Sequence, residues 1–137
     1  MLDRILFGTK VIEKSLDASL MRNEAIAQNI ANVDTPGYKR KTVSFEEELS
    51  DALSKNNSFK GKRTDPRHIP IGGRDVDEVG INVSEDSSSN VMRLDGNNVD
   101  IENEMAKMAE NNIRYNVLIQ RMSNTFSRMK SVIREGR

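Results

Sequence analysis

The chain has 137 residues, with 21 basic and 21 acidic side chains and no formal net charge, so no long-range field draws it to nucleic acid or an anionic membrane. It has no Cys and a single His, His68, which excludes disulfide frameworks, thiol nucleophiles and His-pair metal centres. Aromatic residues make up 4% and Trp is absent. We therefore expect no large self-sufficient core.

The N-terminus is apolar but interrupted by charge, at Asp3, Arg4 and Lys10. It therefore has no continuous signal-peptide core, and no run in the chain approaches the length of a membrane span. We expect no direct membrane insertion and no cleaved signal peptide.

Apolar residues are concentrated at the two ends of the chain and sparse in the middle. All three Pro (Pro36, Pro66 and Pro70) and most Gly lie in that middle, where they favour turns and loops. The sequence predicts a mainly α fold with a helix in residues 1–33, a largely irregular insert in 34–98 and a second helix in 99–137.

The second predicted helix carries an apolar repeat with alternating steps of four and three residues. Its seam positions are Ile101, Met105, Met108, Asn112, Tyr115, Ile119, Met122, Phe126, Met129 and Ile133. A repeat of 3.5 residues sustained over four heptads is typical of a coiled coil. Asn112, the one polar member, either specifies the register with a partner or lies at a locally wet spot.

The first predicted helix carries a weaker seam of the same spacing, with apolar members Ile5, Ile12, Leu16, Ile26, Ile30 and Val33. Both helices would be about 50 Å long, and their matching lengths predict an antiparallel coiled-coil hairpin. Further apolar residues, such as Leu20 and Ile113, lie off the seam. The hairpin should therefore need neighbouring subunits, and its termini should be disordered in the free monomer.

Two further sequence features predict helix N-caps, one within the insert and one at its end. Ser44 is a possible N-cap for a short helix over 44–55, with acidic residues in its first turn. Asp100 or Asn98 is the expected N-cap of the second long helix.

The first helix ends in a distinctive motif, Asn29-Ile-Ala-Asn32, then Val-Asp, then Thr35-Pro36-Gly37-Tyr38-Lys-Arg. Asn32 tolerates the left-handed conformation of a helix end, Pro36 cannot continue the helix, and Gly37 supplies the positive φ of a turn. Tyr38 can then dock beside the helix as an anchor. Physical reasoning alone predicts a helix stop.

This motif resembles the signature of bacterial flagellar basal-body rod and hook axial proteins. The stretch from Asp95 through Met105 to Tyr115 is most similar to the proximal rod proteins of the FlgB type. The resemblance covers both ends of the chain, while residues 56–90 carry no recognisable motif.

The resemblance implies a structural subunit of the proximal rod, which links the base ring to the rest of the rod and transmits torque. Its implied partners are copies of itself, other flagellar rod and base-ring proteins, and the export apparatus. Its implied location is the periplasmic rod of the basal body, within the cell envelope. No cofactor, nucleic acid or small-molecule substrate is implied.

The sequence offers no catalytic or metal-binding set, so we expect no enzyme. His68 lies in a predicted loop, where a lone His is usually solvated, and no Ser, Asp or Glu has triad-like spacing. The alternatives to a proximal rod protein are another short rod protein, or a coiled-coil adapter or secretion chaperone, which would also be helical and free of Cys.

Overall fold

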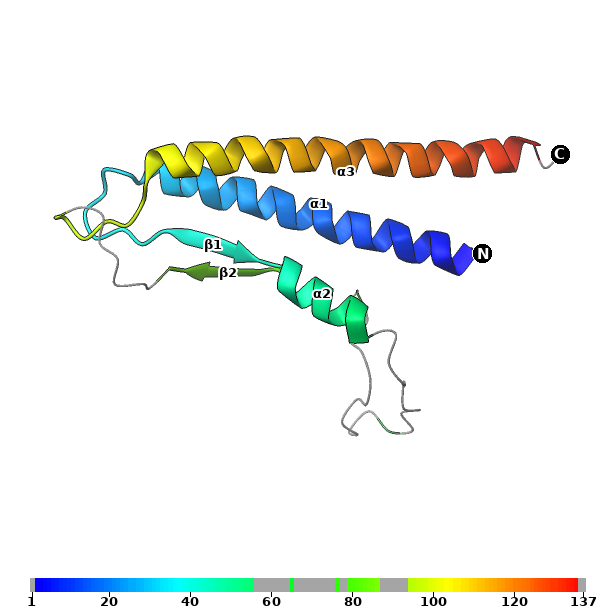
Figure 1. Ribbon diagram of the computed structural model, residues 1–137, viewed down its shortest axis with the longest axis horizontal. Helices are drawn as coiled ribbons and strands as arrows, with labels where there is room; N and C mark the ends of the chain where they lie inside the picture. Colours follow the sequence, from blue (N-terminus) through cyan, green and yellow to red (C-terminus); the bar gives the residue numbers. More distant parts are fainter. Residues whose placement is uncertain (1, 56–64, 66–75, 77–78, 87–93, 136–137) are drawn as a thin grey trace. The chain divides into compact units, whose positions relative to one another are not determined.

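The computed structural model describes the backbone of residues 2–55, 65, 76, 79–86 and 94–135, and the side chains of these except residues 2–6 and 55. Its elements, in chain order, are α1 (Leu2–Ala31), β1 (Lys41–Ser44), α2 (Glu46–Lys55), β2 (Asn82–Glu85) and α3 (Ile101–Glu135) (Figure 1). The predicted mainly α class, with long N- and C-terminal helices, is confirmed.

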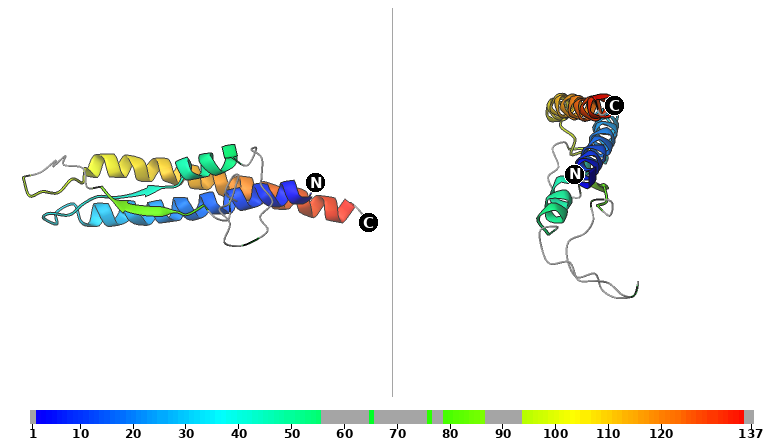
Figure 2. Two further views of the ribbon diagram at one scale, coloured as in Figure 1. Left: turned by 90° about the horizontal axis from the view of Figure 1, so that it is seen from below. Right: turned by 90° about the vertical axis from the view of Figure 1, so that its right-hand side faces the viewer.

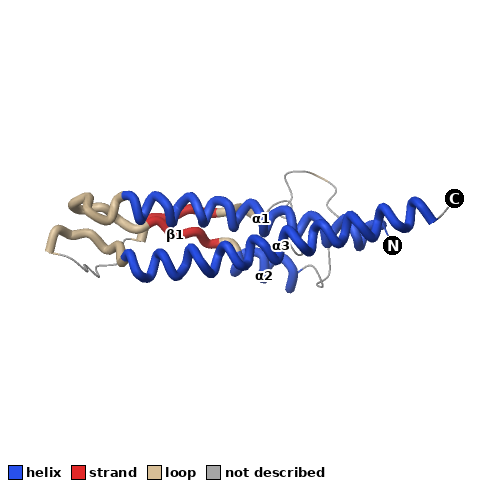
Figure 3. The backbone as a smooth tube through the Cα atoms, turned by 90° about the horizontal axis from the view of Figure 1, so that it is seen from above, coloured by secondary structure: helices blue, strands red, loops and turns tan. Residues whose placement is uncertain are grey.

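The two long helices lie side by side and run in opposite directions (Figures 1 and 2). Polar contacts pair the end of α1 with the start of α3, since Asn29 binds Glu104, and further along Ser19 binds Asn111. The loops that follow α1 and precede α3 therefore meet at one end of the pair (Figure 3). We call this end, from Asn29 to Lys41 and from Asp95 to Glu104, the closed end of the hairpin.

The described chain forms two compact units, one built from residues 1–43 and 83–137 and the other from 44–82. The first unit contains the helix hairpin. The second contains α2, and its buried apolar residues are Phe45, Ala52, Val76 and Val79.

The insert contains a two-stranded antiparallel sheet that the sequence did not predict. The Asp86 amide donates to the Arg40 carbonyl at 2.7 Å, and the Thr42 and Ser84 hydroxyls lie 3.2 Å apart. Strands of four residues are too short for an alternating pattern to stand out. Ser44 belongs to β1 and α2 begins at Glu46, so the predicted N-cap at Ser44 is wrong.

The start of α3 shows which of the two predicted N-cap residues, Asp100 or Asn98, caps the helix. The Asp100 side chain accepts from the Glu102 amide at 3.0 Å and from the Asn103 amide at 3.4 Å. Asp100 is thus the N-cap, because its carboxylate satisfies amides that have no partner within the helix. Asn98 does not cap α3, because its side chain binds Arg40 and Asp86 instead.

The predicted seam of α3 divides into an inner and an outer half. Met108, Tyr115, Met122 and Met129 are half-buried, whereas Ile101, Met105, Asn112, Ile119, Phe126 and Ile133 are exposed. The covered face instead includes Glu104, Asn111, Leu118 and Thr125, each one residue before an exposed seam position. Contacts of the outer half with other subunits stay a prediction.

On α1 the described seam residues face the interior of the unit. Ile26 is buried, and Ile12, Leu16 and Ile30 are half-buried. The Ile5 side chain lies outside the described residues, as does His68. No described helix is long and apolar enough to span a bilayer, and the described part of the chain holds no cluster of three acidic, His or Cys side chains that could bind a metal ion.

Candidate functional site

The helix stop after α1 is a hydrogen-bonded turn. The Asn32 amide still donates to the Gln28 carbonyl at 3.1 Å, and the Tyr38 amide donates to the Thr35 carbonyl at 3.3 Å, enclosing Pro36 and Gly37. Gly37 has a φ of 71°, which is the geometry of a type II turn with Pro at its second position and Gly at its third. The predicted positive φ at Gly37 is confirmed.

Asn32 does not adopt the left-handed conformation that we expected from its position. No non-glycine residue in the described ranges has a positive φ. The Asn32 side chain instead donates to the Gln28 carbonyl at 2.8 Å and accepts from the Thr35 hydroxyl at 3.2 Å. The helix end is therefore stabilised by a side chain that binds both the last helical turn and the residue before Pro36.

Asn97 holds this turn from the other side of the hairpin. Its side chain is fully buried, and its amide nitrogen lies 2.9–3.0 Å from the carbonyl oxygens of Asn32, Val33 and Thr35. Its own oxygen accepts from the Val99 amide at 2.7 Å. One side chain thus donates to three carbonyls of the turn that follows α1, and the carbonyls of Asn32 and Thr35 also accept backbone amides within that turn.

The turn after α1 also docks directly on the turn before α3. The Gly37 amide donates to the Asp95 carbonyl at 3.0 Å, and a Cβ on Gly96, whose φ is 84°, would lie 3.8 Å from the Gly37 Cα. The two glycine turns therefore fix where both long helices end relative to each other.

Asn29 lies at the centre of the closed end and is fully buried. Its nitrogen donates to the Glu104 carboxylate at 2.8 Å and to the Lys41 carbonyl at 2.9 Å. Its oxygen accepts from the Lys41 amide at 2.8 Å and from the Tyr38 hydroxyl at 3.2 Å. Asn29 therefore joins α1, the start of β1 and α3, and all its hydrogen-bonding positions are used.

Glu104 is a buried charge held among opposite charges. It is 2% exposed and accepts from Lys107 at 3.0 Å, with the Arg40 guanidinium 3.8 Å away. Arg40 in turn forms an ion pair with Asp86 at 2.7 Å. Asn98 ties this group together, since it accepts from the Arg40 amide at 2.7 Å and donates to the Asp86 carbonyl at 3.0 Å.

Tyr38 docks against the helix as expected, and burial raises the pKa of its phenol, with the charges of Glu85 and Glu104 acting in the same direction. A pKa raised in the folded state means that this phenol contributes stability below the unfolded pKa of about 10, and loses it as pH rises through the folded pKa. We expect the phenol of a Tyr115→Phe variant, where Tyr38 is the remaining Tyr, to ionise at higher pH in the native chain than in urea. Phenolate absorbance measures this, and equal titration curves would contradict it.

A second polar cluster lies in the middle of the hairpin. Asn111 is buried and donates to the Ser19 carbonyl at 2.7 Å and to the Asn23 side chain at 2.8 Å. Asn23 donates to Asn112 at 3.2 Å. A one-turn slip of either helix would break the bonds between the Asn23 side chain and those of Asn111 and Asn112, so this cluster favours the observed register of α1 against α3.

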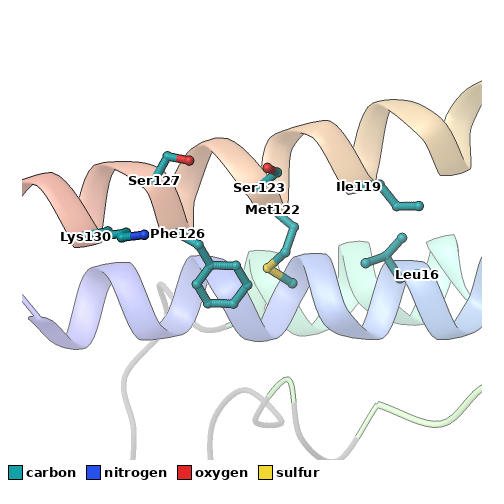
Figure 4. A pocket seen from close by; sticks show the side chains of 7 residues that line it. All are labelled: Leu16, Ile119, Met122, Ser123, Phe126, Ser127 and Lys130. Atoms are coloured by element: carbon teal, nitrogen blue, oxygen red, sulfur yellow. The ribbon is translucent and has the colours of Figure 1, made fainter.

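Toward the termini, the two helices enclose an open apolar groove of about 410 Å³ (Figure 4). Its lining residues are Leu16, Ile119, Met122, Ser123, Phe126, Ser127 and Lys130. In Figure 4 the side chains of Met122 and Phe126 extend from α3 toward α1, and Ile119 lies beside Leu16. Three members of the α3 seam and one of the α1 seam are thus brought together.

The site residues expected from the motif converge at the closed end, but their partners were not foreseen. Asn29, Asn32 and Tyr38 all bond there, whereas the exposed Pro36 acts through the shape of the turn. Asn97, Glu104 and Asn111 form as many contacts and had no separate signal, and Asn98 was considered only as a helix cap. The one available hint was the density of Asn around the two helix ends, because Asn can donate and accept at once.

Comparison with known proteins shows which family the chain is similar to. A family model described as flagella basal body rod protein matches residues 16–39, the end of α1 and the turn. The flagellar basal body rod protein FlgB of Bacillus subtilis is 36% identical over 92% of each chain. Those of Borrelia hermsii and Escherichia coli are 32% and 28% identical, over 87% and 99% of this chain and 90% and 99% of theirs. This chain belongs to the FlgB family of flagellar basal body rod proteins.

Proposed function

We propose that this chain forms the proximal part of the rod, where it links the base ring to the next rod protein and transmits torque. Its family makes it a structural subunit of the basal body rod and not an enzyme. The observation that supports the mechanical role is the closed end of the hairpin, where buried Asn29 and Asn97 join α1 to α3 without a disulfide. Such a junction keeps two long helices together under load.

The fixed register of the helix pair supports the same role. Torque applied to one helix reaches the other only if they cannot slide, and the Asn23, Asn111 and Asn112 cluster opposes sliding. Apolar contacts alone would tolerate a slip, because they have little directional preference. The hairpin therefore has the polar contacts that a load-bearing element needs.

We further propose that the subunit works in the periplasmic rod and reaches it through the flagellar export apparatus. Its partners there are copies of itself and neighbouring rod and base-ring proteins. The names of its relatives, which refer to the basal body rod, support this placement. A coiled-coil adapter or secretion chaperone is not favoured, because the similarity to a rod protein extends over 92% of both chains.

Deletion of the gene tests the proposal directly. We expect cells that lack the chain to have base rings without a rod and no filaments, as seen by electron microscopy of isolated basal bodies, and a plasmid copy to restore both. Complete, rotating filaments in the deletion strain would show that the chain is not a required rod component.

A substitution at Gly37 should affect assembly of the chain but not its export. A Cβ at Gly37 would meet no atom within 4 Å, so substitution there costs only the strain of a positive φ, about 1–2 kcal/mol and more for a β-branched residue. We expect Gly37→Val to be secreted normally but to incorporate poorly into the rod, because an unfolded chain in transit has no turn. Fractionation of secreted and basal-body protein measures both stages.

The matched control for this change is Gly37→Asn, since Asn accepts a positive φ more readily. It should incorporate better than Gly37→Val while also being secreted. Incorporation of Gly37→Val at the wild-type level would mean that the turn geometry has no part in assembly.

A further inference from the structure

The groove between α1 and α3 leaves large apolar side chains open to solvent. Phe126 is 54% exposed and Ile119 is 43% exposed, although both line a concave surface together with Leu16 and Met122. Exposed apolar side chains gathered in one groove are typical of a binding surface. A helix is the partner that fits, because the groove itself is bounded by two helices.

The groove is basic at one end. Lys130 belongs to its lining, and Arg134 follows one turn later on α3. In the described part of the chain neither side chain forms an ion pair, in contrast to Lys107 and Arg114, which pair with Glu104 and Glu110. The cationic end of the groove is thus available to an acidic partner.

The outer face of α1 has the complementary composition. Glu13, Asp17, Leu20 and Glu24 are all exposed and follow one another at steps of four, three and four, which places them on one side of the helix. Leu20 is 49% exposed. Glu13 and Asp17 form no ion pair within the described residues. We call these four residues the acidic face of α1.

We propose that the groove receives the acidic face of α1 from a second copy of this chain. Leu20 of that copy would enter the groove against Ile119 and Phe126, with its acidic neighbours close to Lys130 and Arg134. The inference rests on the proposed function, in which copies of the chain assemble with one another, and it names the surfaces by which they do so.

Such an interface is head-to-tail, because the inserted face and the receiving groove are different surfaces of the chain. An open row of copies keeps one groove unfilled at one end and one acidic face unfilled at the other, so association does not stop at a symmetric dimer. This is the mode of growth that an axial structure needs. Two exposed members of the α3 seam, Ile119 and Phe126, and Leu20, which lies outside the α1 seam, would be covered by the same contact.

Cysteine cross-linking of the full chain tests the pairing of surfaces, since the natural sequence contains no Cys. A tagged Leu20→Cys chain is mixed with an untagged Ser127→Cys chain and oxidised. We expect a mixed disulfide dimer in about fivefold or greater excess over a mixture of Leu20→Cys with Asn103→Cys. Asn103 is also exposed on α3 but lies at the closed end, away from the groove.

Charge reversal in the same assay tests the electrostatic part. Asp17→Lys in the first chain, or Lys130→Glu in the second, should each reduce the mixed dimer severalfold, and the two together should restore it. No excess over the Asn103→Cys control, a predominance of Leu20→Cys homodimers, or the lack of any charge effect would overturn the proposal. Cross-linking of the groove only when another rod protein is added would also overturn it, by assigning the groove to that protein.

The assay separates this inference from the proposed function. If the gene deletion abolishes the rod while the charge-reversed chains assemble normally, the chain is a rod subunit and the assigned interface is wrong. If the deletion leaves the rod intact, the function itself fails, whatever the cross-linking shows.

Discussion

Replacing Asn97 with alanine should destabilise the hairpin by about 3–5 kcal/mol. The change removes four hydrogen bonds of 2.7–3.0 Å, and the Val99 amide then has no partner at a residue that is 3% exposed. A buried polar group left without a partner costs about 1–3 kcal/mol, and the three carbonyls lose their shared donor at the same time. The expected total is a large share of a small protein's stability.

Urea unfolding followed by circular dichroism measures this loss, at a protein concentration at which the wild type is helical. Asn103→Ala is the matched control, because Asn103 is an exposed Asn six residues away along the chain and its truncation should change stability by no more than about 0.5 kcal/mol. If the two variants unfold at the same urea concentration, the closed end does not hold the helices together.

Phe126→Asp should abolish incorporation into the rod while leaving the isolated chain as helical as the wild type. Phe126 is 54% exposed within the subunit, so a charge there costs little until a partner covers it. Burying the carboxylate in a subunit contact would then cost several kcal/mol, on the order of 2–7, in every copy. Ile119→Asp should behave in the same way, because it lines the same groove.

Basal-body fractionation and motility assays measure the effect, with circular dichroism to compare helix content. Asn124→Asp is the matched control, an added charge on an exposed residue of α3 that does not line the groove. Normal motility with Phe126→Asp would remove the outer half of the α3 seam from the assembly contacts. A loss of helix in the isolated variant would show instead that Phe126 stabilises the hairpin itself.

At the end of α1 and the start of α3, most of the local conformation could be predicted from the sequence. Pro36 and Gly37 dictate their turn by the fixed φ of one and the missing Cβ of the other, and the positive φ at Gly37 followed as expected. The cap at Asp100 was one of two local possibilities. The expectation of a left-handed conformation at Asn32 was wrong, because its side chain donates a hydrogen bond to the Gln28 carbonyl. That bond depends on how the turn continues.

In the seam of α3, the apolar periodicity was not sufficient to predict which residues are buried. The heptad repeat identified the helix and the apolar side, but a repeat of apolar residues does not say which flank faces which neighbour. Glu104 and Asn111 are polar, so a hydrophobic pattern assigns them to solvent. In the structure both are buried: the Glu104 carboxylate accepts from Asn29, and the Asn111 nitrogen donates to Ser19 and Asn23. These partners lie far away in the sequence and cannot be predicted from spacing.

By itself, the sequence therefore determined the two long helices, the turn that ends the first of them and the resemblance to flagellar rod proteins, since each depends on residues within a few positions of one another. The tertiary structure alone decided which carbonyls Asn97 binds, where the Glu104 charge is neutralised, and which half of the α3 seam is left open. The physical reason is common to all three. A hydrogen bond or an ion pair has a direction and a length of about 3 Å, so its partner is known only once the two helices have been brought together in register.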